Sequence, residues 1–184
     1  PPPRSTLLPY TTLFRSIDKK IESLPLSSVV SDNRGGGFQA TSHLIQLGHR
    51  RIAYVSYCDL DSLSSVKERF IGYCKALRQH SITLDLEIIY ASIVTLESSN
   101  RLTQVVNDLL KKKVTAIFAE HDYLALDIAR TLSSMGISVP NDISIIGFDN
   151  IELLEHLDIK LTTINQDFGQ IGKRASQIVL KQIK

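Results

Sequence analysis

The chain has 184 residues, a formal net charge of +2, 43% hydrophobic residues and 22% charged residues, which is the composition of an ordinary globular domain. Its apolar runs are shorter than the ~20 residues that cross a bilayer, and its small net charge argues against a segment that binds nucleic acid by itself. Cys58 and Cys74 are too few for a disulfide framework or a four-cysteine zinc site. We expect both to be small buried residues in a reducing compartment.

Residues 1–16 differ in character from the rest of the chain. Their last eight residues read Pro-Tyr-Thr-Thr-Leu-Phe-Arg-Ser, the translation of CCC TAC ACG ACG CTC TTC CGA TCT, which resembles the end of a widely used sequencing adapter. The segment has neither the continuous apolar region of a secretory signal nor the regular arginines of a transit peptide. We expect a non-native, adapter-derived segment; a natural disordered tail is the alternative.

Strand and helix patterns alternate after this segment. Residues 29–30 form a short β-branched run that predicts a strand. A helix is predicted after the glycine run 35–37, because apolar residues then recur at steps of three and four over 38–45. Gly48 stands where a glycine commonly ends a helix, and residues 52–55 form a compact apolar run that predicts the next strand.

The same alternation continues through the second half of the chain. A polar loop over 56–64 precedes a helical stripe over 66–77, with Ser64 or Ser65 as its expected cap. Further strands are predicted at 88–90, 116–118 and 143–146, separated by helical faces over 102–110 and 124–132.

This series predicts an α/β fold with a parallel sheet that is covered on both faces. Ligands of such sheets bind beyond the carboxyl ends of the strands. The residues that follow the predicted strands are therefore site candidates, and they are Tyr57, Asp59, Glu120, His121 and Asp149.

The sequence lacks the common motifs for phosphate, dinucleotide, serine-hydrolase and metalloprotease sites. We therefore assign no catalytic residue, cofactor or metal ligand. His121 and Asp122 could act as a base and its orienting carboxylate, but adjacent residues do not share a helix face and no nucleophile is suitably spaced. An enzyme that uses this pair is an alternative to a binding protein.

Several stretches that are weak signals alone occur together in one order. They are 31–53, 68–73, 115–119, 139–149, 161–168 and 171–172, and they include Leu47-Gly48-His49-Arg50-Arg51 and Val139-Pro140-Asn141-Asp142. In this order they resemble the effector-binding core of LacI/GalR-type transcriptional regulators, which is related to periplasmic sugar-binding proteins. The resemblance covers nearly all of residues 17–184. It implies the type I periplasmic binding protein fold, a parallel-sheet sandwich in which two α/β lobes are joined by crossovers.

The resemblance also implies a division of the chain. It places the end of the first lobe and the crossover at 17–29 and a nearly complete second lobe at 30–149. A return into the first lobe is expected at 150–166, and a closing segment of the second lobe at 167–184. Most of the first lobe, the hinge helix and the helix-turn-helix would be missing, so we expect an N-terminally truncated chain whose match begins where the adapter-like string stops.

The family binds a small molecule, often a sugar or sugar phosphate, between its lobes. The resemblance assigns ligand contacts to Asp149 and Arg69, because charged groups make strong hydrogen bonds to hydroxyl, carboxylate or phosphate groups. The alternatives are that Asp149 caps the next segment and that Arg69 forms a solvated ion pair with Glu68 or another carboxylate. Ser65 lies one turn before Arg69 on the same helix face and is either a ligand contact or the helix cap.

Five further residues are considered. Phe168 falls where the family often places a ligand-lining aromatic, with a core position as the alternative. His121 stands where the family usually has a ligand-contacting Asn, and its ring can both donate and accept. Asp122 is expected to cap the following helix. Tyr57 and Asp59 are expected either to line the cleft or to lie in an exposed loop.

The resemblance implies a cytoplasmic, homodimeric transcription regulator with no membrane contact. Effector binding would close the lobes, shift a two-state equilibrium and change operator affinity through the helix-turn-helix. We expect this chain to bind no DNA specifically, and to bind effector weakly or not at all because most of one cleft wall is missing. The alternative is a free-standing sugar-binding protein of an importer, although residues 47–51 and 139–142 resemble the regulators more closely.

Overall fold

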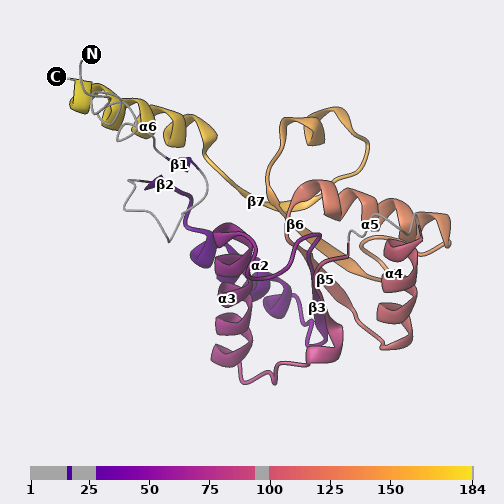
Figure 1. Cartoon of the computed structure of the whole chain (residues 1–184). Helices are drawn as coiled ribbons and strands as arrows, with labels where there is room; N and C mark the ends of the chain where they lie inside the picture. The colour runs from indigo at the N-terminus through magenta and orange to yellow at the C-terminus, as the bar shows by residue number, and fades with distance from the viewer. Residues whose placement is uncertain (1–15, 18–27, 94–99, 184) are drawn as a thin grey trace, which may run out of the picture. The chain divides into compact units, whose positions relative to one another are not determined.

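The computed structural model describes residues 16–17, 28–93 and 100–183 (Figure 1). The predicted adapter-derived segment, apart from Ser16, lies outside the described residues. The chain divides into two compact units, one made of residues 1–31 and 167–184 and the other of Asp32–Gln166. The second unit contains most of the described residues and is taken first.

This unit is built on a five-stranded, parallel sheet with the strand order β4-β3-β5-β6-β7. In chain order the strands are β3 (Ile52–Val55), β4 (Ile89–Tyr90), β5 (Ala116–Ala119), β6 (Ser144–Asp149) and β7 (Thr162–Asn165). Every residue of β3 and β5 is buried, as expected when both faces of a parallel sheet are covered. The α/β class predicted from the sequence is confirmed.

Helices cover both faces of this sheet (Figure 1). On one face lie α2 (Asn33–Gln46) and α3 (Ser64–Gln79), and on the other lie α4 (Arg101–Lys111) and α5 (Asp122–Ser134). Short 3₁₀ helices, η2 (Leu86–Ile88) and η3 (Glu152–His156), precede β4 and follow β6.

Two hydrophobic clusters form between the helices and the sheet. Ile52 and Tyr54 of β3 join the cluster beneath α2 and α3, whereas Ala53 and Val55 join the cluster beneath α4 and α5. Successive side chains of a strand point to opposite faces. One short apolar strand therefore contributes to both clusters, which explains why its sequence is continuously hydrophobic.

Helix α2 includes the glycine run that was predicted to precede it. The helix begins at Asn33, and the Asp32 carboxylate caps it by accepting from the Gly35 backbone N–H at 2.8 Å. The spacing of apolar residues could not show this start, because Gly35, Gly36 and Gly37 contribute no side chains to a helical stripe. The prediction of a helix here is confirmed, but its predicted start was too late.

The glycines are needed because α2 and α3 touch backbone to backbone. A Cβ atom on Gly37 would stand 2.2 Å from the carbonyl oxygen of Arg69, and one on Gly72 would stand 2.2 Å from the carbonyl oxygen of Arg34. Real Cβ atoms do not approach other atoms so closely. Any larger residue at either position would push the two helices apart.

The last strand corrects the predicted division of the chain. Residues 150–166 were expected to return into the first lobe, but β7 pairs with β6 in the sheet of the second unit. Ile164 lies opposite Phe148 in this pairing and packs against the same hydrophobic cluster. Residues 167–184, expected to close the second lobe, group instead with the first unit.

The first unit contains a short parallel pair and one long helix. Strands β1 (Ser16–Ile17) and β2 (Ser28–Val29) pair in parallel. Helix α6 (Phe168–Ile183) contacts β2 and buries Ile171 and Ala175.

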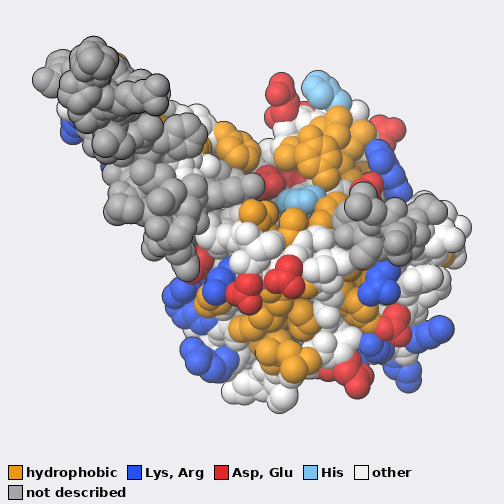
Figure 2. Space-filling view, in the orientation of Figure 1, with side chains coloured by type: hydrophobic (Ala, Val, Ile, Leu, Met, Phe, Trp, Pro, Cys, Tyr) orange, Lys and Arg blue, Asp and Glu red, His pale blue; other side chains and the backbone are white. Residues whose placement is uncertain are grey.

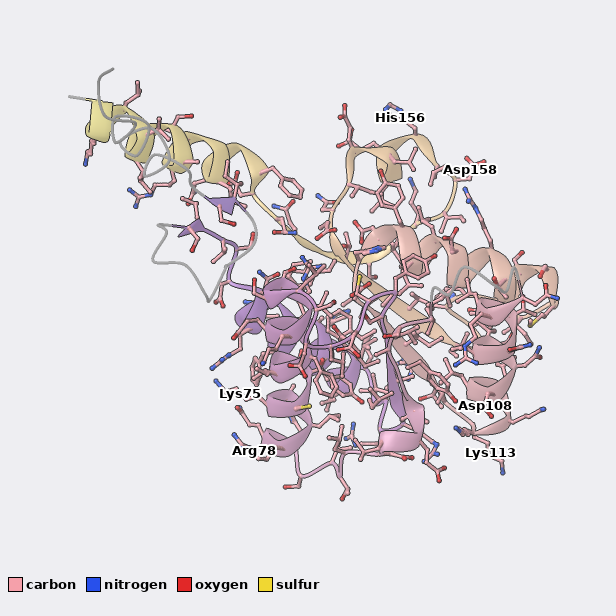
Figure 3. All side chains as sticks on the ribbon, viewed as in Figure 1. Lys75, Arg78, Asp108, Lys113, His156 and Asp158 are labelled. Carbon is pink, nitrogen blue, oxygen red and sulfur yellow. The ribbon has the colours of Figure 1, made fainter. Side chains whose placement is uncertain are left out.

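The outer surface of the second unit carries mixed charges. Lys75 and Arg78 on α3, Lys113 after α4, and His156 and Asp158 near η3 are exposed and point away from the sheet (Figure 3). On the face drawn in Figure 2, positive and negative side chains of the described residues are interspersed. Among the described residues, no helix combines the length and the apolar character needed to span a membrane.

Candidate functional site

A cluster of polar side chains, most of them buried, lies at the carboxyl edge of the five-stranded sheet. We call it the carboxyl-edge cluster, and its members are Asn33, Ser56, Arg69, Glu120, Asp149 and Gln166. Four of these residues end or directly follow strands, and the other two come from α2 and α3. The cluster thus occupies the edge at which parallel α/β sheets bind ligands.

Arg69 is the centre of the cluster. Its Nε donates to Asn33 Oδ1 at 2.8 Å, and its Nη1 donates to the Glu120 carbonyl oxygen at 2.5 Å. Its Nη2 bonds Asp149 Oδ1 at 3.1 Å, in an ion pair with side chains only 6% and 19% exposed. The guanidinium also lies 3.8 Å from the centre of the Phe148 ring, a cation–π contact. Arg69 therefore connects the start of α2 with the ends of β5 and β6.

Asp149 receives both of its side-chain hydrogen bonds on one oxygen. Besides Arg69, Gln166 Nε2 donates to Oδ1 at 2.5 Å, and the Gln166 backbone N–H donates to the Asp149 carbonyl oxygen at 3.2 Å. Among the described residues, Oδ2 of Asp149 has no donor. The expected alternative, in which Asp149 caps the next segment, is not what its side chain does.

Glu120 is a buried carboxylate beside this pair. It is 1% exposed, and it accepts hydrogen bonds from the Ser56 hydroxyl at 2.5 Å and the Tyr57 backbone N–H at 2.8 Å. These contacts join the ends of β3 and β5. The nearest nitrogen of His121, Nε2, lies 3.8 Å from Glu120 Oε1.

His121 is the N-cap of α5. Its Nδ1 accepts from the Leu124 backbone N–H at 3.1 Å, so in the neutral ring the hydrogen is on Nε2. The ring lies among aromatic neighbours, with centre-to-centre distances of 5.4 Å to Tyr57 and 6.3 Å to Tyr123. The Tyr57 hydroxyl donates to Asp127 Oδ2 at 2.5 Å. Burial and this bond raise the pKa of Tyr57, so the phenol stays protonated.

Asp122 is not the expected helix cap. Its side chain is fully buried, its Oδ1 accepts from the Thr163 hydroxyl at 2.5 Å, and its Oδ2 accepts from the Ile151 backbone N–H at 3.0 Å. The enzyme alternative required this carboxylate to orient His121. Because its oxygens instead accept from Ile151 after β6 and from Thr163 in β7, Asp122 does not orient His121.

The remaining predicted residues have different positions. Ser65 is buried in the first turn of α3, and the cap position is Leu63, which makes no side-chain bond, so neither Ser64 nor Ser65 caps the helix. Phe168 begins α6 in the first unit and is 51% exposed. Asp59 lies in an exposed loop, where it accepts from the Asp61 N–H.

The structure adds Asn33, Ser56 and Gln166, which were not singled out from the sequence. Gln166 directly follows β7, so the strand-end rule would have found it if residues 162–165 had been assigned to this sheet. Asn33 and Ser56 gave no comparable signal. In the described ranges, no group of three or more His, Cys, Asp or Glu residues could hold a metal ion.

The chain is similar to curated bacterial repressors. The HTH-type transcriptional repressor PurR of Vibrio atlanticus is 36% identical over 163 residues, which are 89% of this chain and 48% of the relative. The arabinose metabolism transcriptional repressor of Geobacillus stearothermophilus is 34% identical over 160 residues, 85% of this chain and 43% of the relative. The chain thus spans about half the length of these relatives.

Solved structures of regulators have the same fold. A LacI family transcriptional regulator from Enterococcus faecium with bound ribose has a TM-score of 0.79 and 34% identity, and the match covers 92% of this chain and 62% of that one. The complex of the regulator CelR with cellobiose has a TM-score of 0.78 and 28% identity, covering 92% and 51%. These relatives lend no support to the importer alternative. Residues 41–184 match the periplasmic binding protein-like domain family, and the chain belongs to that family as an effector-binding core of the LacI type.

Proposed function

We propose that this chain senses a small polyol, such as a sugar, as the effector-binding core of a DNA-binding transcription regulator. The observation that carries the proposal is the Arg69–Asp149 ion pair at the carboxyl edge of the sheet. Arg69 and Gln166 both bond Oδ1 of Asp149, which leaves Oδ2 for a ligand hydroxyl. Charge-assisted hydrogen bonds of this kind are strong. The ribose-bound relative supports a sugar as the ligand class.

The other predicted contacts have complementary roles in this proposal. Asp149 accepts from a ligand hydroxyl, and the His121 Nε2–H donates to a ligand oxygen. The rings of His121 and Tyr57 provide an apolar wall for the ligand. Arg69 is too deeply buried to be the main ligand contact, and it acts mainly by holding Asp149 in place. Ser65 and Phe168 stay predicted contacts.

In the whole protein, this core would act without catalysis. Effector binding would favour one of two lobe arrangements, and the difference in effector affinity between them would set the size of the response. Operator DNA would be bound through a helix-turn-helix segment by a cytoplasmic homodimer, since two-fold symmetry suits palindromic operators. The repressor relatives support this assignment.

The proposal is tested by titrating the 184-residue chain with ribose, arabinose and cellobiose and recording NMR spectra. We expect saturable shifts at His121 and Asp149 with at least one sugar, and about millimolar affinity, equivalent to ~4 kcal/mol. Asp149→Asn should abolish them because it removes the charge that strengthens the bond to a hydroxyl.

Asp158→Asn is the matched control, because Asp158 is exposed and points away from the sheet. It should bind the sugar as the wild type does. Hypoxanthine, a planar base without vicinal hydroxyls, is the contrasting ligand. Saturation by hypoxanthine alone would overturn the assignment of a polyol effector.

A further inference from the structure

The chain turns sharply at the candidate effector residue. Asp149 has a φ of 112° and Asn150 a φ of 55°, a left-handed backbone that side chains other than glycine rarely adopt. Two such residues in succession persist only where the surroundings hold them. We call Asp149 and Asn150 the β6 corner.

The Asp122 carboxylate lies beside the β6 corner. It accepts from the Ile151 backbone N–H, directly after the corner, at 3.0 Å, and from the Thr163 hydroxyl of β7 at 2.5 Å. The Asn150 backbone N–H donates to the Thr163 hydroxyl oxygen at 3.4 Å, and this hydroxyl in turn donates to Asp122. Asp122 is fully buried, so these hydrogen bonds replace those that its carboxylate would otherwise make with water.

The absence of a side chain on Gly147 leaves space in the sheet for the Asp122 carboxylate. A Cβ atom on Gly147, two residues before the corner, would stand 2.2 Å from Asp122 Oδ1 and 3.2 Å from a methyl group of Leu161. Glycine is therefore required here by close approach rather than by backbone conformation. Three elements meet at one charged group: the start of α5, the end of β6 and β7.

From this geometry we propose that Asp122 is a positioning residue of the effector site. Its carboxylate holds the β6 corner in the left-handed conformation and thereby fixes the direction in which Asp149 presents Oδ2. The effector part of this proposal rests on the proposed function, whereas the control of the corner stands on the contacts alone.

The experiment compares Asp122→Ala with wild type in the full chain by NMR. Loss of a hydrogen bond to a charged acceptor should speed exchange of the Ile151 amide about tenfold. The strong intraresidue amide–Hα NOE of a positive-φ residue should weaken at Asn150, and the carboxyl carbon of Asp149 should shift. Asp158→Ala, exposed near η3, should change none of these signals.

Two milder variants, both at Thr163, test the proposal if Asp122→Ala fails to fold. Thr163→Val removes the hydroxyl that donates to Asp122 but keeps the shape of the side chain, whereas Thr163→Ser keeps the hydroxyl. We expect Thr163→Val to disturb the Asn150 and Ile151 signals and Thr163→Ser to restore them. Gly147→Ala should act like Thr163→Val, with Gly172→Ala, which meets open space, as its control.

Unchanged Asn150 and Ile151 signals in Asp122→Ala, or in Thr163→Val if the first variant is unfolded, would overturn the positioning role. Ribose titration then separates the two proposals. If wild type binds ribose, Asp122→Ala should weaken binding about tenfold, comparable to one lost hydrogen bond to a charged group; equal affinity with a disturbed corner would overturn the link to Asp149. If hypoxanthine alone saturates wild type, the proposed function fails, and the corner signals still decide the role of Asp122.

Discussion

At the residue scale, Arg69 is a charged side chain that is almost completely buried. It is nearly inaccessible to solvent, yet its charge is balanced by Asp149 and its donors are used by Asn33 and the Glu120 carbonyl. A buried charge is tolerated when it is paired and hydrogen-bonded in this way. The planar guanidinium can reach acceptors in several directions at once, which a lysine ammonium on a flexible stem cannot do.

Arg69→Ala should therefore destabilise the chain strongly. It leaves the Asp149 carboxylate without its cation and Asn33 Oδ1 without its donor, and breaking a buried pair from one side costs about 3–5 kcal/mol. The free energy of unfolding in urea measures the effect. Arg130→Ala, which removes an exposed arginine 3.7 Å from Asp127, should change stability by no more than about 0.5 kcal/mol. Equal urea midpoints for the two variants would contradict this view of Arg69.

The sequence allowed part of the site to be predicted residue by residue. Asp149 and His121 follow apolar strands, and the end of such a strand is visible as a change from hydrophobic to polar residues. Arg69 came from the family resemblance. Asn33 and Gln166 were missed because their contacts with Arg69 and Asp149 depend on helix and strand positions that local spacing does not encode.

At the element scale, His49 connects the starts of two neighbouring strands. Its Nδ1 lies 3.0 Å from the Thr115 hydroxyl, just before β5, and its Nε2 lies 3.0 Å from the hydroxyl of Ser144, the first residue of β6. Burial lowers the pKa of His49 below its ordinary value of 6.5. Protonation is therefore harder in the folded chain than in the unfolded chain.

This difference predicts a loss of stability in mild acid. The contribution of neutral His49 is fully present above pH 6.5 and decreases as the pH falls from 6.5 towards the lowered folded-state pKa. Urea unfolding between about pH 7.5 and 5.5 should show wild type losing stability relative to His49→Gln, whose amide does not titrate. His80→Gln, at an exposed position, should follow wild type. A His49→Gln curve parallel to wild type would refute the assignment.

The order of elements was predictable, but two of their positions were not. Continuous apolar runs marked β3, β5 and β6 because both faces of these strands are buried. The start of α2 was hidden because glycines leave no hydrophobic stripe. Strand β7 was not predicted, because Thr162–Asn165 is only partly buried and forms no continuous apolar run. Its pairing with β6 places it in the sheet of the second unit.

At the scale of the whole molecule, the five-stranded unit contains its own cores. Both hydrophobic clusters are made entirely of residues between 38 and 164, inside the unit Asp32–Gln166. A chain of residues 32–166 should therefore fold alone and unfold in urea at the midpoint that this unit has in the full chain. Because the sequence has no tryptophan, near-ultraviolet circular dichroism of the buried Tyr54 and Tyr73 is the measurement.

A shorter chain of residues 32–149 provides the contrast. It lacks β7, so it leaves the edge of β6 unpaired and removes Ile164 from the cluster that contains Phe148. We expect this chain to have a lower midpoint or no cooperative transition. Equal midpoints for 32–149 and 32–166 would show that β7 adds nothing to the stability of the unit.

The hydrogen-bond partners of the Arg69–Asp149 pair lie close to the two ends of the five-stranded unit. The chain passes between the two units at Ser31–Asp32 and at Gln166–Asp167. Asn33, just after the first passage, bonds Arg69, and Gln166, just before the second, bonds Asp149. The ion pair therefore connects the residues beside the beginning and the end of the unit Asp32–Gln166, so that this unit is joined to itself where its chain enters and leaves.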